Sequence, residues 1–129
     1  MTLGSRCLVC LLLHNLVAPS WAAGDPGRGE RVFQYCYSCH SVERTETQRL
    51  QGPNLAGIVG RRIAGEAGFA YSPAMRAFAE REESWSEALL DRYLAAPYKA
   101  VPKTSMAFGG VPEDEERADL IAYLKQAGR

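Results

Sequence analysis

Two cysteines and a histidine lie within a stretch of five residues, as Cys36, Cys39 and His40. Their order, Cys-x-x-Cys-His, is the attachment signature of a c-type haem. Side chains three residues apart lie on nearly one side of a helical turn, so both thiols can form thioether bonds to neighbouring haem vinyl groups. The imidazole of the next residue can then bind the iron from one face. The motif therefore predicts one covalent haem c, attached through Cys36 and Cys39, with His40 as an iron ligand.

Three other interpretations of the two cysteines are weaker. A thioredoxin-like redox pair is typical of a βαβ pattern, and few segments of this chain have strand-like alternation. A disulfide between Cys36 and Cys39 would close a very small loop and stabilise the fold little. A zinc site needs about four nitrogen, sulfur or oxygen ligands, and the chain after residue 23 has no further cysteine or histidine.

The second axial ligand of the iron must come from another side chain, and two methionines follow residue 23. A thioether suits low-spin haem iron and raises its reduction potential. Met106 lies in the segment 101–110, where proline, glycine and small residues indicate an irregular loop. Met75 follows Ser72 and Pro73, which indicate the start of a short helix, where methionine usually fills the core. We favour Met106 as the iron ligand, with Met75 or an open iron position as the alternatives.

The single histidine after residue 23 limits the possible functions. It excludes bis-histidine ligation and a second haem c, and a histidine-dependent hydrolase would need His40 itself as its base. Two protein ligands leave the iron no site for a substrate, so the sequence predicts a one-electron carrier and not an enzyme. The alternatives are a peroxidase-like or NO- or CO-binding haem protein with a labile sixth ligand, and a haem module that works only within a larger complex.

Residues 1–23 have the pattern of a cleaved secretory signal peptide. Arg6 precedes an apolar stretch at 7–13, and the small residues of 20–24 are typical of a cleavage site. A buried N-terminal helix and a retained membrane anchor are the alternatives, although the apolar stretch is short for an anchor. Cys7 and Cys10 would leave with the signal peptide. We therefore expect a domain at residues 24–129 that is exported to the periplasm. Export agrees with the haem motif, because c-type haem is attached outside the cytoplasm.

Composition excludes two classes of protein. The 129 residues contain 15 Lys+Arg and 15 Asp+Glu, a formal net charge of zero, whereas a nucleic-acid-binding domain usually has a basic surplus. No apolar run approaches the roughly 18 residues that predict a membrane-spanning helix, so we expect no stable membrane insertion after signal cleavage. The remaining length is typical of one domain, and we expect a monomer.

Several segments resemble the class I c-type cytochromes, close to the mitochondrial cytochrome c and bacterial c2 branch. Gly29–Phe33 resembles the opening helix of that family, and Gly52–Gly57 resembles the turn after the haem motif. Tyr93–Pro97 and Pro102–Phe108 resemble the helix end and the loop that support and carry the axial methionine. The resemblance implies a small all-α fold, with four to five helices around one haem.

The resemblance also implies roles for individual residues around the haem. The carbonyl of Pro53 would accept the ring N–H of His40, and the hydroxyl of Tyr93 would support Met106. The haem propionates would be bound by Arg61, Tyr71 and Trp85, and Phe108 would belong to the residues around the haem. Trp85 and Tyr93 are also apolar enough to be core residues only.

The resemblance implies redox partner proteins: an oxidase, a bc1-type complex, a photosynthetic reaction centre or a dehydrogenase. In the methionine loop, Lys103 and Ser105 depart from the glycine and lysine that the family often has there. Lys99 and Lys103 flank this loop, and a second basic zone could form from Arg44, Arg49, Arg61 and Arg62.

Four helices are expected to position these residues. The first runs from residue 25 or 26 to about 37, and the second covers residues 73–80. The third follows the capping box Ser84-x-x-Glu87 and ends at Pro97. The fourth follows Pro112 and has the acidic residues 113–116 in its first turn. Residues 41–62 are predicted as loop. Phe33, Phe78 and Leu120 are expected in the core.

Overall fold

The computed structural model describes residues 23–128, so the predicted signal peptide lies, apart from Ala23, outside the described residues. Within this range the chain forms α1 (Pro26–Val32), the 3₁₀ helix η1 (Phe33–Tyr35), α2 (Pro73–Ala79), α3 (Glu87–Ala95), α4 (Pro97–Ala100) and α5 (Asp114–Gln126). The described residues form no β-strand, only an isolated bridge between Arg62 and Ser84. The predicted all-α fold is confirmed. None of these helices has the length and apolar character needed to cross a membrane.

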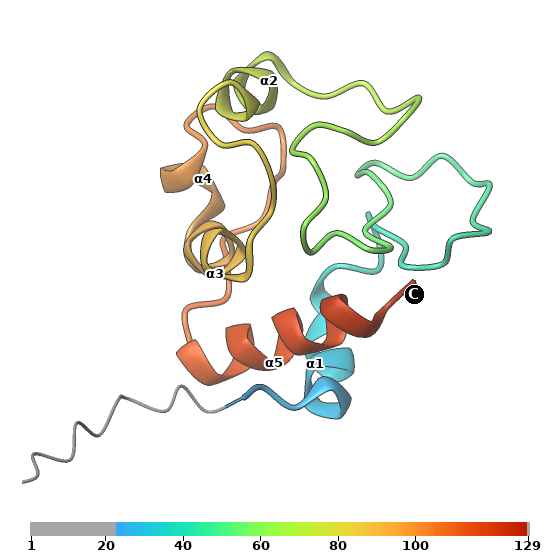
Figure 1. Ribbon diagram of the computed structural model, residues 1–129, viewed down its shortest axis with the longest axis vertical. Coiled ribbons are helices and arrows are strands. Elements are labelled where there is room, and N and C mark those ends of the chain that lie inside the picture. The colour runs from blue at the N-terminus through green and yellow to red at the C-terminus, as the bar shows by residue number, and fades with distance from the viewer. Residues whose placement is uncertain (1–22, 129) are drawn as a thin grey trace, which may run out of the picture.

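Helix α5 lies beside α1 at one end of the domain, α3 packs against α5, and α2 and α4 lie farther from this end (Figure 1). The long loop between η1 and α2 occupies the opposite side from α3 and α4. One apolar cluster joins the helices, and the predicted core residues Phe33, Phe78 and Leu120 are all buried in it. The remaining buried members are Val32, Ile58, Ile63, Trp85, Leu89, Leu90, Tyr93, Leu94, Val101, Val111, Ile121 and Leu124.

Helix α1 begins where the sequence predicts. The side chain of Asp25 accepts a hydrogen bond from the backbone N–H of Arg28 at 2.7 Å. Pro26 takes the first helical position, where a backbone N–H has no partner within the helix, so proline loses no hydrogen bond there. The α-helix ends at Val32 and continues only as a 3₁₀ turn to Tyr35, earlier than the expected end near residue 37. The haem motif therefore follows the helix instead of lying within it.

Gly29 lies where α1 crosses α5. A Cβ atom on Gly29 would stand 2.0 Å from the backbone oxygen of Asp119 and 2.7 Å from the Cβ atom of Tyr123. The nearest obstacle is backbone, so no flexible side chain can move away from the added atom. The rings of Phe33 and Tyr123 pack beside the crossing, with centroids 5.4 Å apart. Glycine at this position is what permits the close approach of the two helices.

Replacing Gly29 with alanine should lower the free energy of unfolding by about 2–3 kcal/mol, because overpacking forces the two helices apart. Urea unfolding followed by circular dichroism measures this loss. The matched control is Gly27→Ala in the same helix, where a Cβ atom would meet only the side chain of Asp25, at 3.2 Å. Alanine there should change the stability by less than about 1 kcal/mol. Equal losses at both positions would contradict the role of the crossing.

Asp119 on α5 joins the start of the domain to its last helix. Its carboxylate accepts hydrogen bonds from Arg28 at 2.6 and 2.9 Å and from the backbone N–H of Asp25 at 2.6 Å. The hydrogen bond from Arg28 is the main reason that the pKa of Asp119 is lowered, against burial, which acts to raise it. Because the folded pKa lies below the unfolded one, the carboxylate stabilises the domain at higher pH, and this contribution is lost as the pH falls through the folded pKa.

The start of α3 differs from the sequence prediction. The capping box Ser84-x-x-Glu87 is wrong, because the N-cap residue is Ser86, whose hydroxyl accepts a hydrogen bond from the N–H of Leu89 at 3.1 Å. Ser84 is instead paired with Arg62 in the isolated bridge, which keeps the chain extended at that point. A tertiary pairing therefore delays the helix by two residues.

The segment that carries Met106 is a loop closed at both ends, as the sequence predicts for this irregular region. Pro97 follows the end of α3 as expected, and it also begins α4, a short helix that the sequence analysis missed. The N–H of Val101 donates to the carbonyl of Pro97 at 2.8 Å, and the N–H of Val111 donates to the carbonyl of Leu94 at 2.8 Å. These two bonds fix where the loop leaves and rejoins the helices.

Candidate haem-binding site

The Cys-x-x-Cys-His motif forms a tight turn directly after η1. The N–H groups of Cys39 and His40 both donate to the carbonyl of Cys36, at 3.0 and 2.9 Å. Both thiols are free and partly buried, and no disulfide joins them. The turn therefore holds two unbonded thiols and one imidazole close together, as the sequence motif predicts.

The environment of Cys36 argues against a thiol redox pair. Burial raises the pKa of this thiol to about 11, and the neighbouring Cys39 adds to the increase. Reactive redox cysteines have lowered pKa values because the thiolate is the nucleophile. Among residues 23–128, no three side chains of His, Cys, Asp or Glu are grouped so that they could hold a metal ion, so the described chain offers no zinc site of that kind either.

The ring of His40 is fixed in one orientation. Its Nδ1 atom lies 2.7 Å from the carbonyl oxygen of Pro53, the contact that the family resemblance implies. A carbonyl can only accept, so Nδ1 carries the proton and the lone pair of the neutral ring is on Nε2. Burial lowers the pKa of His40, against the Pro53 contact, which raises it. The imidazole therefore presents Nε2 as a free donor atom, suited to a metal.

Gly52 provides the space in which the His40 ring lies. A Cβ atom at Gly52 would stand 2.2 Å from Cε1 of the ring and 2.7 Å from Nε2. The N–H of Gly52 also donates to the carbonyl of Cys39 at 2.8 Å, which joins this turn to the haem motif. Sequence reasoning noted this glycine only as part of a family segment, and its contact with the ring became visible in the structure.

Met106 has its sulfur held by a buried hydroxyl. The hydroxyl of Tyr93, near the end of α3, donates to Sδ of Met106 at 3.7 Å. The N–H of Met106 donates to the hydroxyl of Thr104 at 3.2 Å, which fixes the backbone of the loop. Burial raises the pKa of Tyr93, with a smaller opposing effect from the Thr104 side chain. Tyr93 therefore stays protonated as a donor to the thioether, the contact that the resemblance implies.

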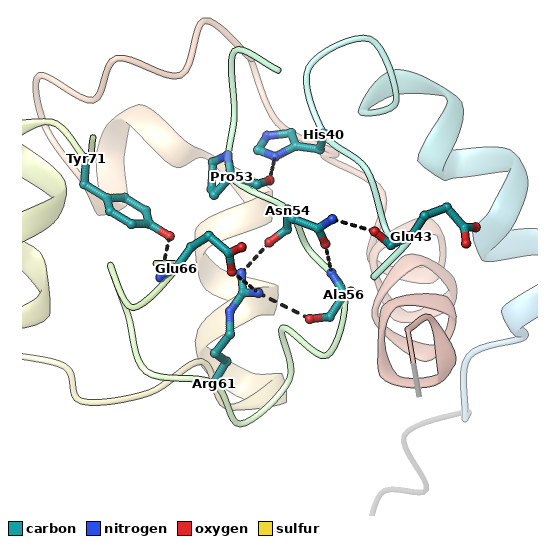
Figure 2. A network of polar contacts seen from close by, with 8 residues as sticks. All are labelled: His40, Glu43, Pro53, Asn54, Ala56, Arg61, Glu66 and Tyr71. Carbon is teal, nitrogen blue, oxygen red and sulfur yellow. Dashed lines mark hydrogen bonds and ion pairs between the residues drawn. The ribbon is translucent and has the colours of Figure 1, made fainter. Parts of the chain in front are cut away.

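Arg61 is the centre of a polar network beside the turn that contains Pro53 and Asn54 (Figure 2). Its guanidinium donates to the carbonyl of Asn54 at 2.6 Å, to the carbonyl of Ala56 at 3.2 Å and to the carboxylate of Glu66 at 3.0 Å. Its Nε atom is buried and has no hydrogen-bond partner within the described residues. The hydroxyl of Tyr71 accepts the N–H of Glu66 at 3.2 Å, so its own proton remains available to donate.

Apolar side chains at the edge of the core complete the site. Cys36, Leu55, Val59, Met106 and Phe108 are partly buried and pack against the buried cluster. Such side chains offer both a contact with the core and a free apolar surface. With the two thiols, the free Nε2 of the histidine, the thioether and the unpaired Arg61 N–H, this donor set fits a covalently attached haem with acidic substituents.

Trp85 and Met75 are placed as core residues. Trp85 is buried, with its ring between those of Phe78 and Tyr93, at centroid distances of 5.9 and 4.9 Å. Its predicted bond to a propionate remains a prediction. Met75 lies on α2 and packs against the same cluster, which agrees with the core role considered for it from the sequence.

Two residues at the polar side of the site correct the sequence analysis. Arg61 does not belong to the suggested basic surface zone, because its side chain is only 20% exposed and is paired with Glu66. Its neighbour Arg62 is exposed. Glu66 was missed altogether, since no local pattern indicates that a loop carboxylate five residues after an arginine folds back onto it.

Comparison with known proteins identifies the family. The model of the cytochrome c family matches residues 27–128. The chain belongs to the cytochrome c family. It is 48% identical over 106 residues to cytochrome c of Chlamydomonas reinhardtii, covering 81% of this chain and 91% of that protein. It is 42% identical over 107 residues to cytochrome c2 of Rhodomicrobium vannielii, covering 83% and 82%, and 41% identical over 105 residues to cytochrome c of Ginkgo biloba, covering 81% and 89%.

Membership of the cytochrome c family decides between the functions that the sequence left open. This cytochrome is an electron-transfer protein and not an enzyme. Its cofactor is covalently bound haem c with its iron, and it works with redox partner proteins.

Proposed function

We propose that this cytochrome c carries single electrons on one haem attached through Cys36 and Cys39 and ligated by His40 and Met106. The observation that carries the proposal is the 2.7 Å contact between Nδ1 of His40 and the Pro53 carbonyl. Because that contact uses the ring proton, Nε2 is left as the only donor atom, and the fixed ring needs no reorganisation to bind a metal.

When bound, the haem supplies an iron that takes up and releases one electron. Pro53 keeps the proton on Nδ1 of His40 and would hold this imidazole toward the iron. Tyr93 donates to the sulfur of Met106 and would hold this thioether as the second ligand. The apolar surroundings disfavour the extra positive charge of the ferric form, and the thioether acts in the same direction, so both raise the reduction potential.

The polar side of the site suits the acidic haem substituents. The unpaired Nε–H of Arg61 and the hydroxyl proton of Tyr71 are donors without a partner among the contacts described. We assign both donors, together with Trp85, to the propionates. Phe108 would contact the apolar part of the haem, and Pro53 would lie on the side of the haem where His40 binds. A charged donor that is buried without a partner is costly, and a carboxylate would remove that cost for Arg61.

We also propose export and partner classes for this cytochrome. Residues 1–23 would be cleaved as a signal peptide, leaving residues 24–129 as a monomer in the periplasm. An oxidase, a bc1-type complex, a photosynthetic reaction centre or a dehydrogenase of a respiratory or photosynthetic chain would exchange electrons with it. Lys99 and Lys103 are exposed beside the Met106 loop, and a local basic patch can steer docking even at zero net charge.

The visible spectrum of the purified holoprotein tests the ligand assignment. The ferric form should show a far-red charge-transfer band of a methionine–iron bond, and the reduced form should not bind CO, because His40 and Met106 would both bind the iron. A high-spin ferric spectrum, or rapid CO binding by the reduced protein, would contradict ligation by both His40 and Met106. It would favour instead the alternative of a labile sixth position.

A further inference from the structure

Glu66 places a negative charge in the network that surrounds Arg61. Its Oε2 atom lies 3.0 Å from Nη1 of Arg61. The two side chains are only 20% and 32% exposed, so this ion pair is screened by water less than a surface pair would be. The backbone N–H of Glu66 is bound by the hydroxyl of Tyr71, which fixes the residue at both its main chain and its side chain.

The donors of Arg61 show what this carboxylate does. A guanidinium has five N–H donors and no acceptor. Carbonyl oxygens of Asn54 and Ala56 accept from Nη2 and Nη1, and Glu66 accepts from Nη1 as well, whereas the buried Nε–H is unpaired. Glu66 therefore aims the guanidinium so that its Nε side remains free, and it is the one carboxylate that pairs with this charge among the described contacts.

The same network is joined to the proposed iron ligand through a short piece of backbone. Nη2 of Arg61 donates to the carbonyl of Asn54 at 2.6 Å, and the preceding carbonyl, that of Pro53, binds the His40 ring at 2.7 Å. Figure 2 shows Glu66, Arg61, Asn54, Pro53 and His40 in this order. A change of charge at Glu66 therefore changes the electrostatic potential on the side of the site where His40 lies.

We propose that Glu66 is a positioning residue that partly neutralises Arg61 and thereby lowers the reduction potential of the haem iron. This inference rests on the proposed attachment and ligation of the haem. Reduction adds an electron to the iron, so a nearby positive charge favours it and a nearby negative charge disfavours it. The guanidinium of Arg61 alone would raise the potential, and the carboxylate of Glu66 offsets part of that effect.

The test is a redox titration of the holoprotein with Glu66 changed to glutamine, which removes the charge and keeps the shape. The equilibrium constant for reduction should rise about threefold, equivalent to an upward shift of about 28 mV at 59 mV per tenfold. Glu66→Asp keeps the charge and should shift the equilibrium constant by less than half as much on a logarithmic scale. If Glu66→Gln does not accumulate as holoprotein, Glu66→Ala is titrated in its place, because it removes the same carboxylate.

The matched control is Glu30→Gln, which removes one negative charge from the exposed side of α1 and should leave the midpoint potential unchanged. An unchanged potential in Glu66→Gln would overturn the proposal, and so would equal upward shifts in Glu66→Gln and Glu66→Asp, because geometry and not charge would then be the cause. If the proposed haem ligation is itself wrong, the ferric spectrum of the wild-type protein already lacks the far-red methionine band. That result is distinct from a wrong role for Glu66, in which the band is present and the potential does not shift.

Discussion

Replacing Met106 with alanine should lower the midpoint potential of the haem by at least about 59 mV, a tenfold change in the one-electron equilibrium. A thioether ligand stabilises the ferrous over the ferric iron, and alanine leaves the axial position to water or another donor. A spectroscopic redox titration measures the shift, and the ferric spectrum should lose the far-red band in the same variant. The reduced variant should also bind CO, which the parent protein should not.

Met75→Ala is the matched control for this experiment. Met75 is the other methionine of the described chain, and it packs against the core from α2, with its N–H donating to the Ser72 hydroxyl at 3.2 Å. Its removal should cost stability and leave the potential and the far-red band in place. If Met75→Ala lost the band and Met106→Ala kept it, the two methionines would have to exchange roles.

Changing both Cys36 and Cys39 to alanine should give a colourless protein that has lost most of its helical circular dichroism. A domain of this size has a modest core of its own. The side chains around the site, including Leu55 and Phe108, are only partly buried by the polypeptide, so a large apolar cofactor is needed to cover the rest. Haem staining after denaturing electrophoresis and far-ultraviolet circular dichroism measure the two losses.

The single variant Cys39→Ala separates attachment from folding. It keeps one thioether through Cys36 and both iron ligands, so it should remain coloured and helical with reduced stability. A double variant that is colourless yet fully helical and cooperatively folded would show that the polypeptide core is sufficient without the cofactor.

Local chemistry made much of the fold predictable. Two helices start where the sequence predicts, after Asp25 and Ser72, each of which is followed by proline and accepts a backbone hydrogen bond. The acidic first turn of α5 and the end of α3 before Pro97 also lie where the pattern indicates. These features depend on interactions within a few residues, which is the range over which one sequence is informative.

The features that the sequence could not predict depend on distant partners. Ser84 satisfies the capping pattern, but its pairing with Arg62 keeps it extended, and Ser86 caps α3 in its place. Glu66 and Arg61 meet only because the loop folds back on itself. At the haem site, the motif alone indicated Cys36, Cys39 and His40, whereas the roles of Pro53 and Tyr93 came from the family resemblance and their contacts from the structure.

The pairing of α1 with α5 also dictates when this protein can fold. Arg28 and Asp119 are 91 positions apart, and the glycine crossing beside them joins the same two ends of the domain. A chain that emerges from its N-terminal end therefore cannot complete this contact until its last helix is released. Residues 36–40 precede α5 by more than seventy positions, so in such a chain the attachment motif is present before the domain can close.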